Sequence, residues 1–163
     1  MSATMEDFRA AFRTHPAGVA LITATVDGEP VGLTLSSLTS LSLDPLAVAF
    51  SFSRTTGSAG KVISAPSYVI HLLGESHAEL AKAFAHSDGR RFTEDQEWDR
   101  LPSGEPYLRS APHAFRARTL ESVAVGDSRM IAAEILDSIP GPAEGRLVYQ
   151  DRTFFSTAGA RIL

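Results

Sequence analysis

Short apolar runs rich in β-branched residues alternate with turn formers along most of the chain. Residues 19–26 form one such run, and Asp27-Gly28 follows it, a pair that tolerates the positive φ angles of a tight hairpin. A second strand is therefore expected from about Val31. Asp44-Pro45 indicates another turn, and residues 46–52 (LAVAFSF) carry so little polar surface that they predict a strand buried on both faces.

The second half of the chain continues in the same way. Residues 67–73, 113–124 and 129–139 each predict a strand, and residues 147–156 (LVYQDRTFFS) predict one last strand. Residues 86–112 are polar and rich in turn formers. They predict a long loop, and long loops in small domains are often functional.

Helices are expected only as short insertions. Thr4 should cap a helix that ends at His15-Pro16, because the residue before a proline avoids helical angles. A helical turn is expected before Pro66, and a capping box at residues 76–79 predicts a further helix, with one apolar face made of Leu80, Ala81 and Phe84. Six or seven strands with two or three short helices predict an all-β barrel, formed as a single domain over residues 1–163.

Composition narrows the class of protein. The chain has 163 residues, a net charge of −4 and no cysteine, so disulfides, thiolate metal sites and cysteine nucleophiles are excluded. The charge suggests no nucleic-acid or membrane-surface partner. The acidic start is unlike a signal peptide, and no apolar run reaches the roughly 20 residues that span a bilayer. A soluble cytoplasmic protein is expected.

Common catalytic motifs are missing. There is no GxSxG elbow, the five histidines lack metal-ligand spacing, and GSAGKV at residues 57–62 has neither the length of a P-loop nor its Ser or Thr after the lysine. No metal site is expected. An enzyme of this kind would take its chemistry from a bound cofactor, although a binding module without activity would carry the same sequence features.

Several blocks occur in an order that matches a known family. The first runs from Gly18-Val19 through Asp27-Gly28 to Gly32-Leu33-Thr34 and then SSLTSLSLDP at residues 36–45. Downstream come FAHSDGRRF at 84–92, GEPYL at 104–108, GDS at 126–128 and LVYQDRTFF at 147–155. Together they cover nearly the whole chain, which resembles the flavin reductase-like domain family, the small reductase components of two-component flavin-dependent monooxygenases.

The resemblance implies a fold and an activity. It implies an FMN-binding split β-barrel, usually a homodimer, with FMN or FAD bound near the subunit interface. The implied reaction is hydride transfer from NADH or NADPH to the flavin, after which reduced flavin diffuses to a separate monooxygenase. Neither the choice between FMN and FAD nor that between NADH and NADPH can be made from the sequence.

The resemblance also names candidate cofactor-binding residues. Without it, Ser and Thr alternating with Leu would be ordinary strand patterning. With it, the isoalloxazine and ribityl side should be lined by Thr34, Leu35, Ser36 and Ser37, with Thr39 and Ser40 as further candidates. The second wall and part of the phosphate site should come from Ser51, Phe52, Ser53, Arg54, Thr55 and Thr56. Arg91 should supply a phosphate cation from the long loop, next to Phe92.

Four positions depart from the family pattern. Ala17 replaces a hydroxyl residue, Leu46 a second proline, and Ala133 a glycine. Ser128 replaces the histidine of a G-D-H motif, which in the family lies near the flavin and the nicotinamide. Ser128 is thus the candidate catalytic position. Its identity motivates one alternative, a flavin-binding protein with a different or lost oxidoreductase activity. A non-catalytic binding domain that holds no flavin is a further alternative.

Overall fold

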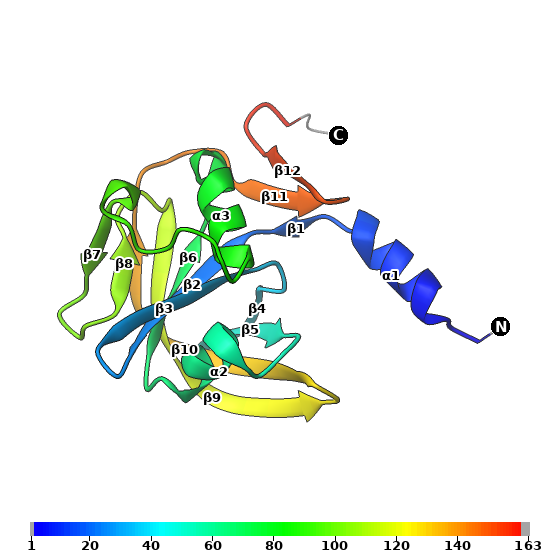
Figure 1. Cartoon of the computed structure of the whole chain (residues 1–163), viewed down its shortest axis with the longest axis horizontal. Coiled ribbons are helices and arrows are strands. Elements are labelled where there is room, and N and C mark those ends of the chain that lie inside the picture. The colour runs from blue at the N-terminus through cyan, green and yellow to red at the C-terminus, as the bar shows by residue number, and fades with distance from the viewer. Residues whose placement is uncertain (1, 161–163) are drawn as a thin grey trace.

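A seven-stranded antiparallel sheet forms the body of the molecule in the computed structural model, which describes residues 2–160 (Figure 1). Its strand order is β3-β2-β6-β9-β10-β5-β4. The bounds are β2 Ala20–Val26, β3 Glu29–Leu35, β4 Thr39–Leu43, β5 Leu46–Phe52, β6 Tyr68–Leu72, β9 His113–Val125 and β10 Ser128–Pro140. The edge strands β3 and β4 do not pair with each other, so the barrel stays open between them. The expected all-β split barrel is confirmed.

Two smaller sheets complete the β-structure. One has the order β1-β11-β12, from Ala17–Gly18, Leu147–Gln150 and Thr153–Ser156, and the other pairs β7 (Trp98–Arg100) with β8 (Pro106–Leu108). Two sequence predictions were therefore wrong. The last strand is a hairpin, because Asp151 and Arg152 both adopt positive φ and reverse the chain. The expected loop at 86–112 contains the β7–β8 hairpin.

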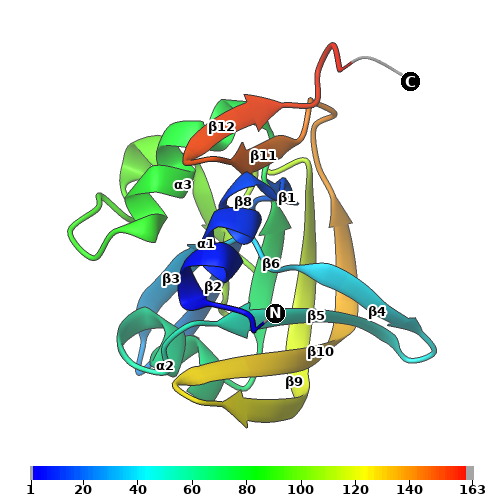
Figure 2. The same ribbon diagram turned by 90° about the vertical axis from the view of Figure 1, so that its right-hand side faces the viewer.

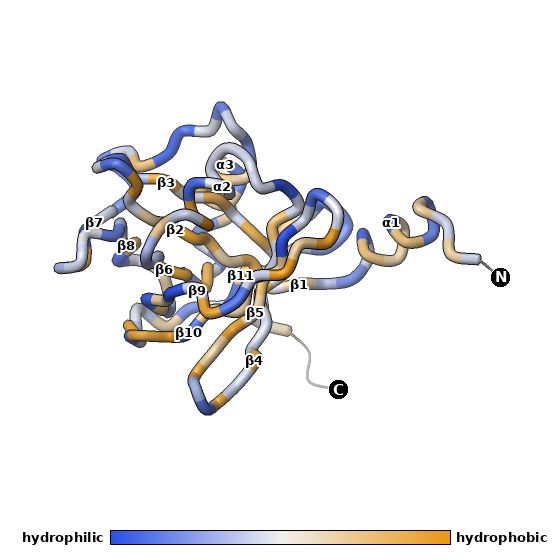
Figure 3. Tube along the Cα trace, turned by 90° about the horizontal axis from the view of Figure 1, so that it is seen from below, coloured by the Kyte–Doolittle hydropathy of each residue, from blue (hydrophilic) through white to orange (hydrophobic). Residues whose placement is uncertain are grey.

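The helices are short. They are α1 (Met5–Thr14), α2 (Gly57–Ser64) and α3 (Ala78–Ala85), with 3-10 turns η1 (Glu75–His77) and η2 (Glu94–Gln96). Thr4 caps α1 as expected, and His15 ends it. Figure 1 and Figure 3 show α1 extending away from the body, and Figure 2 and Figure 3 show the same for the β4–β5 hairpin. No helix among residues 2–160 is long and apolar enough to cross a membrane.

The predicted capping box at residues 76–79 does not form. The turn η1 comes first, and the backbone N–H of Gly74 donates to His77 Nδ1 at 3.2 Å. The Ser76 hydroxyl instead donates to Glu144 Oε1 at 3.0 Å. A contact distant in sequence has replaced the local cap. The helix still buries Ala81 and Phe84, as the periodicity predicted.

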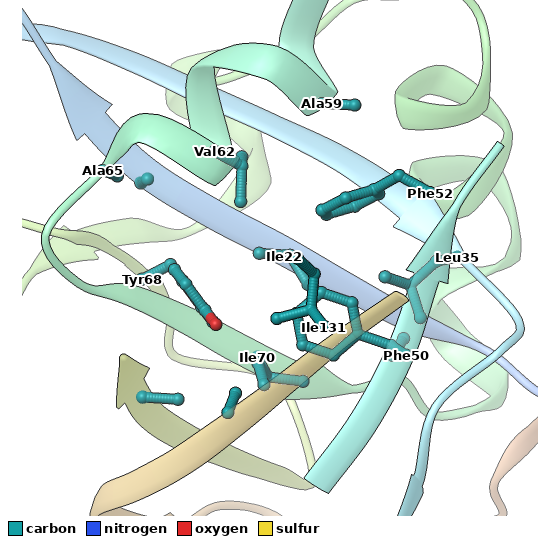
Figure 4. Close-up of a cluster of buried hydrophobic side chains, with 14 of the residues drawn as sticks. Ile22, Leu35, Phe50, Phe52, Ala59, Val62, Ala65, Tyr68, Ile70 and Ile131 are labelled. Carbon is teal, nitrogen blue, oxygen red and sulfur yellow. The ribbon is translucent and has the colours of Figure 1, made fainter. Parts of the chain in front are cut away.

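Two apolar clusters hold the fold together. The first fills the barrel beneath α2 and includes Ile22, Phe50, Val62, Tyr68 and Ile131 (Figure 4). The second lies under α3 and includes Val19, Leu21, Leu73, Phe84 and Leu108. Each fully buried side chain of this size contributes about 1.5–3 kcal/mol.

Strand β5 is not buried along its whole length, contrary to expectation. Phe50 and Phe52 belong to the first cluster, whereas Leu46 at the start of the strand is 55% exposed and Ser51 is exposed. The reason is its position, because β4 is the edge strand and the β4–β5 hairpin projects beyond the sheet.

A buried histidine joins the GEPYL segment to the barrel. His71 Nε2 accepts a hydrogen bond from the Leu108 backbone N–H at 3.1 Å, so Nδ1 carries the proton and donates to the Leu21 carbonyl at 3.0 Å. Thr23 Oγ1 donates to the Pro106 carbonyl at 2.6 Å. The imidazole is fully satisfied in its neutral form. Burial lowers its pKa to about 4, with a further lowering from His77, against the opposing effect of the Leu21 bond.

Candidate functional site

A cavity of about 660 Å³ lies at the open side of the barrel, where the ends of β3 and β5 meet the start of α2. This volume is within the roughly 300–1,000 Å³ of small-molecule sites. Three stretches of chain line the cavity: residues 33–37, residues 51–59 except Thr55, and four residues of the segment 84–91, which are Phe84, Ala85, Ser87 and Arg91. Ser128, at the start of β10, completes the lining. We call it the hydroxyl cavity, after the Ser and Thr residues in its wall.

Most of the residues predicted from the sequence come together in this cavity. They are Thr34, Leu35, Ser36, Ser37, Ser51, Phe52, Ser53, Arg54, Thr56, Arg91 and Ser128. Their side chains come from β3, β5, the loop before α2, the loop after α3, and β10. Only the fold can bring these segments to one place.

Four predicted residues lie outside the wall. Thr55 does not line the hydroxyl cavity, and Thr39 and Ser40 are exposed on the edge strand β4 after the chain has left the opening. Phe92 packs into the second cluster, with its ring 5.0 Å from Phe84 and 4.9 Å from Trp98 between centroids. Its φ of 55° turns the side chain inward, which the sequence does not reveal.

Several lining residues were missed by sequence reasoning. They are Leu33, Gly57, Ser58, Ala59, Phe84, Ala85 and Ser87. Gly57 to Ala59 follow directly on the predicted loop, so its continuation into a helix was the available signal. Position 60 in α2 requires a glycine, because a Cβ there would overlap the carbonyl of Thr55. A larger residue would prevent the loop before α2 from folding against the helix.

The α2 end of the cavity is electropositive. The first turn of α2, at residues 57–59, lines the wall, and its N-cap residue Thr56 makes no side-chain hydrogen bond to it. Backbone N–H groups at a helix start favour an anion. The Arg54 side chain lies on the same wall. Together these groups suit a phosphate.

Arg91 contributes charge to this wall while joining three elements. Its Nη1 donates to the Gly32 carbonyl at 3.1 Å and to Ser58 Oγ at 3.0 Å, and its Nε donates to the Ala83 carbonyl at 3.3 Å. Nη2 donates to the carbonyl of His86. Burial lowers the pKa of Arg91, and Asp88 opposes that shift. The guanidinium keeps its charge, because an arginine stays protonated in proteins, but its hydrogen-bond donors are directed to the protein.

Two of the predicted hydroxyls hold the walls in place. Thr34 Oγ1 donates to the Ala81 carbonyl at 2.8 Å and so joins β3 to α3. Ser37 Oγ accepts from the Ser51 backbone N–H at 2.9 Å and donates to the Ser51 carbonyl at 3.1 Å. These bonds keep the two segments at a defined separation across the open side of the barrel.

The lining fits a ligand with three chemical parts. Leu35, Phe52 and Phe84, which are largely buried, form an apolar floor on which a ring system could lie. Serine and threonine hydroxyls offer partners for a polyhydroxyl chain, and the α2 end offers a place for an anion. FMN has these three parts in this order. Among the described residues, no group of three or more His, Cys, Asp or Glu side chains could hold a metal ion.

Comparison with known proteins agrees with this lining. The family model described as the flavin reductase like domain matches residues 12–158. The NADH:FMN oxidoreductase of Rhodococcus qingshengii is 41% identical over 125 residues, which are 77% of this chain and 65% of that protein, so the chain spans about two-thirds of its length. The reductase component of a 4-nitrophenol 4-monooxygenase/4-nitrocatechol 2-monooxygenase from Rhodococcus opacus is 28% identical over 146 residues, 90% of this chain and 78% of that protein.

The fold comparison gives the same family. The crystal structure of a flavin reductase domain protein from Arthrobacter sp. FB24 superposes with a TM-score of 0.87 at 25% identity, covering 94% of this chain and 95% of that one. A family match over most of the chain, a shared fold and the resemblance of the sequence blocks all agree. The chain belongs to the flavin reductase like domain family.

Proposed function

We propose that this protein is an NAD(P)H-dependent flavin reductase with NADH and FMN as its pair, acting as a single domain. The observation that carries the proposal is the hydroxyl cavity, in which residues 33–37 form one wall and residues 51–54 with Thr56 form the other, around an apolar floor with a positive end. The similarity to an NADH:FMN oxidoreductase supports the choice of donor and acceptor.

The residues of the cavity divide the work of holding the flavin. Leu35, Phe52 and Phe84 would pack against the ring, and the start of α2 with Arg54 would hold the phosphate. Bound flavin supplies the hydride acceptor. The protein supplies orientation and electrostatics, which is all that this chemistry requires of it.

Ser128 is the least typical part of the site. It lines the cavity at the start of β10, where the family has a histidine. A serine hydroxyl can donate one hydrogen bond, but unlike an imidazole it does not exchange a proton near neutral pH. This substitution supports the second candidate function, a flavin-binding protein with a different or lost oxidoreductase activity.

Two kinds of partner belong to the proposal. A separate monooxygenase would take up the reduced flavin, as the similarity to a monooxygenase reductase component suggests. A second copy of this chain would cover the apolar groups outside the body, since Phe8 and Phe12 of α1 are 62% and 61% exposed. Further exposed apolar residues lie on the projecting hairpins: Leu41, Leu43, Val123, Val125 and Met130. We also propose a cytoplasmic location, because the nicotinamide cofactor that donates the hydride is found in the cytoplasm.

The test is the visible spectrum of the purified protein, followed by NADH and NADPH oxidation with FMN and then FAD added. Turnover that requires added flavin is the expected result. A yellow protein without turnover would favour the second candidate function, and a colourless protein that ignores both flavins would refute flavin binding. Arg54→Gln should weaken FMN affinity, whereas Arg109→Gln, an exposed arginine outside the cavity, is the matched control. Sedimentation of the same sample tests the homodimer.

A further inference from the structure

His77 connects three segments of the chain and lies outside the wall of the hydroxyl cavity. It is the last residue of η1 and the N-cap residue of α3, and its side chain is only 6% exposed. The imidazole Nε2 lies 3.1 Å from Ser110 Oγ, in the turn between β8 and β9. Its Nδ1 lies 3.2 Å from the backbone nitrogen of Gly74 and 3.2 Å from Oε1 of Glu144, in the segment between β10 and β11.

The two partners of Nδ1 require opposite protonation states. The Gly74 N–H can donate only to an Nδ1 that carries no proton, whereas the Glu144 carboxylate can accept only from an Nδ1 that carries one. The neutral imidazole therefore holds Gly74, and the imidazolium holds Glu144. In both forms Nε2 keeps its proton and donates to Ser110 Oγ, which fixes the ring while Nδ1 changes partner.

Burial and the surrounding charges set which form prevails. Burial lowers the pKa of His77 below its ordinary value of 6.5, against the opposing charges of Glu144 and Glu97. The groups that face the imidazole, or share the cavity of about 240 Å³ beside it, come from several elements: Glu144 from the segment before β11, Asp95 and Glu97 from η2 and the residue after it, and the neutral His71 from β6. Glu75 of η1 is held elsewhere, by the Ser156 hydroxyl. The neutral form therefore prevails at neutral pH, and acidification below pH 6.5 produces the imidazolium.

A proton on His77 changes the support of two neighbouring segments. Glu144 already accepts from the Ser76 hydroxyl at 3.0 Å, so an ion pair with His77 would tighten the segment before β11 against η1. This segment leads into β11, at the same end of the molecule as α3 (Figure 1, Figure 2). The buried Gly74 N–H, in contrast, would lose its acceptor. A positive charge would also stand at the N-terminus of α3, where the helix dipole disfavours a cation.

Helix α3 connects His77 to the hydroxyl cavity. Phe84 and Ala85, at the other end of the helix, line that cavity, and the Thr34 hydroxyl of the cavity wall donates to the Ala81 carbonyl at 2.8 Å. The helix has only eight residues, so His77 lies within about two and a half turns of the wall. A weakened start of α3 therefore loosens one side of the cavity.

We propose that His77 is a proton-operated switch of the flavin site. On acidification Nδ1 releases the Gly74 N–H and binds Glu144, α3 loses its support, and the FMN affinity of the hydroxyl cavity falls. By thermodynamic reciprocity, bound FMN must then make His77 harder to protonate. The effect on FMN rests on the proposed function, whereas the change of partner at Nδ1 does not.

NMR on the protein without flavin tests the change of partner. The neutral imidazole of His77 should carry its proton on Nε2, and the amide signal of Gly74 should shift with the same midpoint as the His77 ring. Glu144→Gln removes a charge that favours the imidazolium, so it should move both midpoints to lower pH. A neutral ring protonated on Nδ1, or a Gly74 signal that does not follow the ring, would overturn the switch.

FMN titrations across the His77 midpoint test the coupling to the flavin site. His77→Gln keeps an acceptor for the Gly74 N–H and a donor for Ser110 in one uncharged side chain. The parent should lose about fivefold more FMN affinity on acidification than His77→Gln does, the lower end of coupling between separate sites. Titration of the FMN phosphate is common to both proteins and cancels in this comparison. His113→Gln, at a histidine bonded to Ser138 and outside both cavities, should keep the loss of the parent.

The outcomes separate the switch from the proposed function. Equal losses of FMN affinity in the parent and in His77→Gln would overturn the switch and leave the flavin reductase function standing. A parent that binds no flavin at neutral pH would overturn the proposed function together with the coupling, while the change of partner at Nδ1 would still be decided by the NMR experiment.

Discussion

Acidification should destabilise this protein mainly through the buried imidazole of His71. His71 is fully buried and neutral, with its two ring nitrogens hydrogen-bonded to backbone groups of β2 and β8. Burial lowers its pKa from 6.5 to about 4. Between these two values the unfolded chain binds a proton that the folded chain does not. The free energy of unfolding therefore falls as the pH falls from 6.5 toward 4.

The size of the effect follows from the shift. Each pKa unit corresponds to about 1.4 kcal/mol, so the stability lost through His71 should be about 2 kcal/mol at pH 5 and about 3 kcal/mol at pH 4. Burial also lowers the pKa of His77, against the opposing charge of Glu144, and this adds a loss of the same sign. A total stability of roughly 5–15 kcal/mol makes such losses large.

Urea unfolding followed by Trp98 fluorescence measures the loss, because Trp98 is the only tryptophan and its ring lies 6.0 Å from His71 between centroids. The free energy of unfolding should fall between pH 7 and pH 5 in the parent, and the fall should be smaller in His71→Gln. His15→Gln, which changes an exposed histidine, should keep the full loss. A stability that stays level over this range, or a His71 NMR signal that titrates near pH 6.5, would refute the reasoning.

Three further substitutions test the site and its support. Arg91→Ala removes hydrogen bonds to β3, α2 and α3, so it should lower the free energy of unfolding by about 2 kcal/mol. It should also weaken FMN binding, and an unchanged flavin titration would exclude Arg91 from the site. Ser128→His should change the steady-state response to NADH, and an identical response would mean that position 128 does not touch the reacting groups. Gly32→Ala places a Cβ 2.9 Å from the Ile22 carbonyl, so it should lower the free energy of unfolding by about 1–3 kcal/mol and lower the urea midpoint. An unshifted midpoint would contradict the close approach.

Local features of the fold were predictable because they depend on neighbouring residues. The Asp27-Gly28 hairpin has φ angles of 53° and 81°, as the pair indicates. The helix between Thr4 and His15 and the long β9–β10 hairpin also appear as expected. Each of these rests on caps, turn chemistry or strand periodicity, which act within a few residues.

The two walls of the site were predictable for a different reason. Residues 34–37 and 51–54 were identified by a family resemblance and then found around one cavity. Periodicity alone would have assigned their hydroxyls to a solvated strand face. The same resemblance also named Thr39, Ser40 and Phe92, which lie outside this cavity. A motif is continuous in sequence, whereas the cavity wall ends where β4 begins and where Phe92 packs into the core.

Tertiary structure alone decided the remaining features. The sequence marked Arg91 as a phosphate cation, but its donors go to carbonyls of residues that lie 5, 8 and 59 positions away. A further cavity, beside α3, joins that helix to the Tyr149–Phe154 hairpin, and no local signal links them. The sequence by itself determined the class of fold, the family and the segments that carry the hydroxyls. Contacts between distant segments determined which side chains line the cavity, since the lining depends on how the barrel closes and where it stays open.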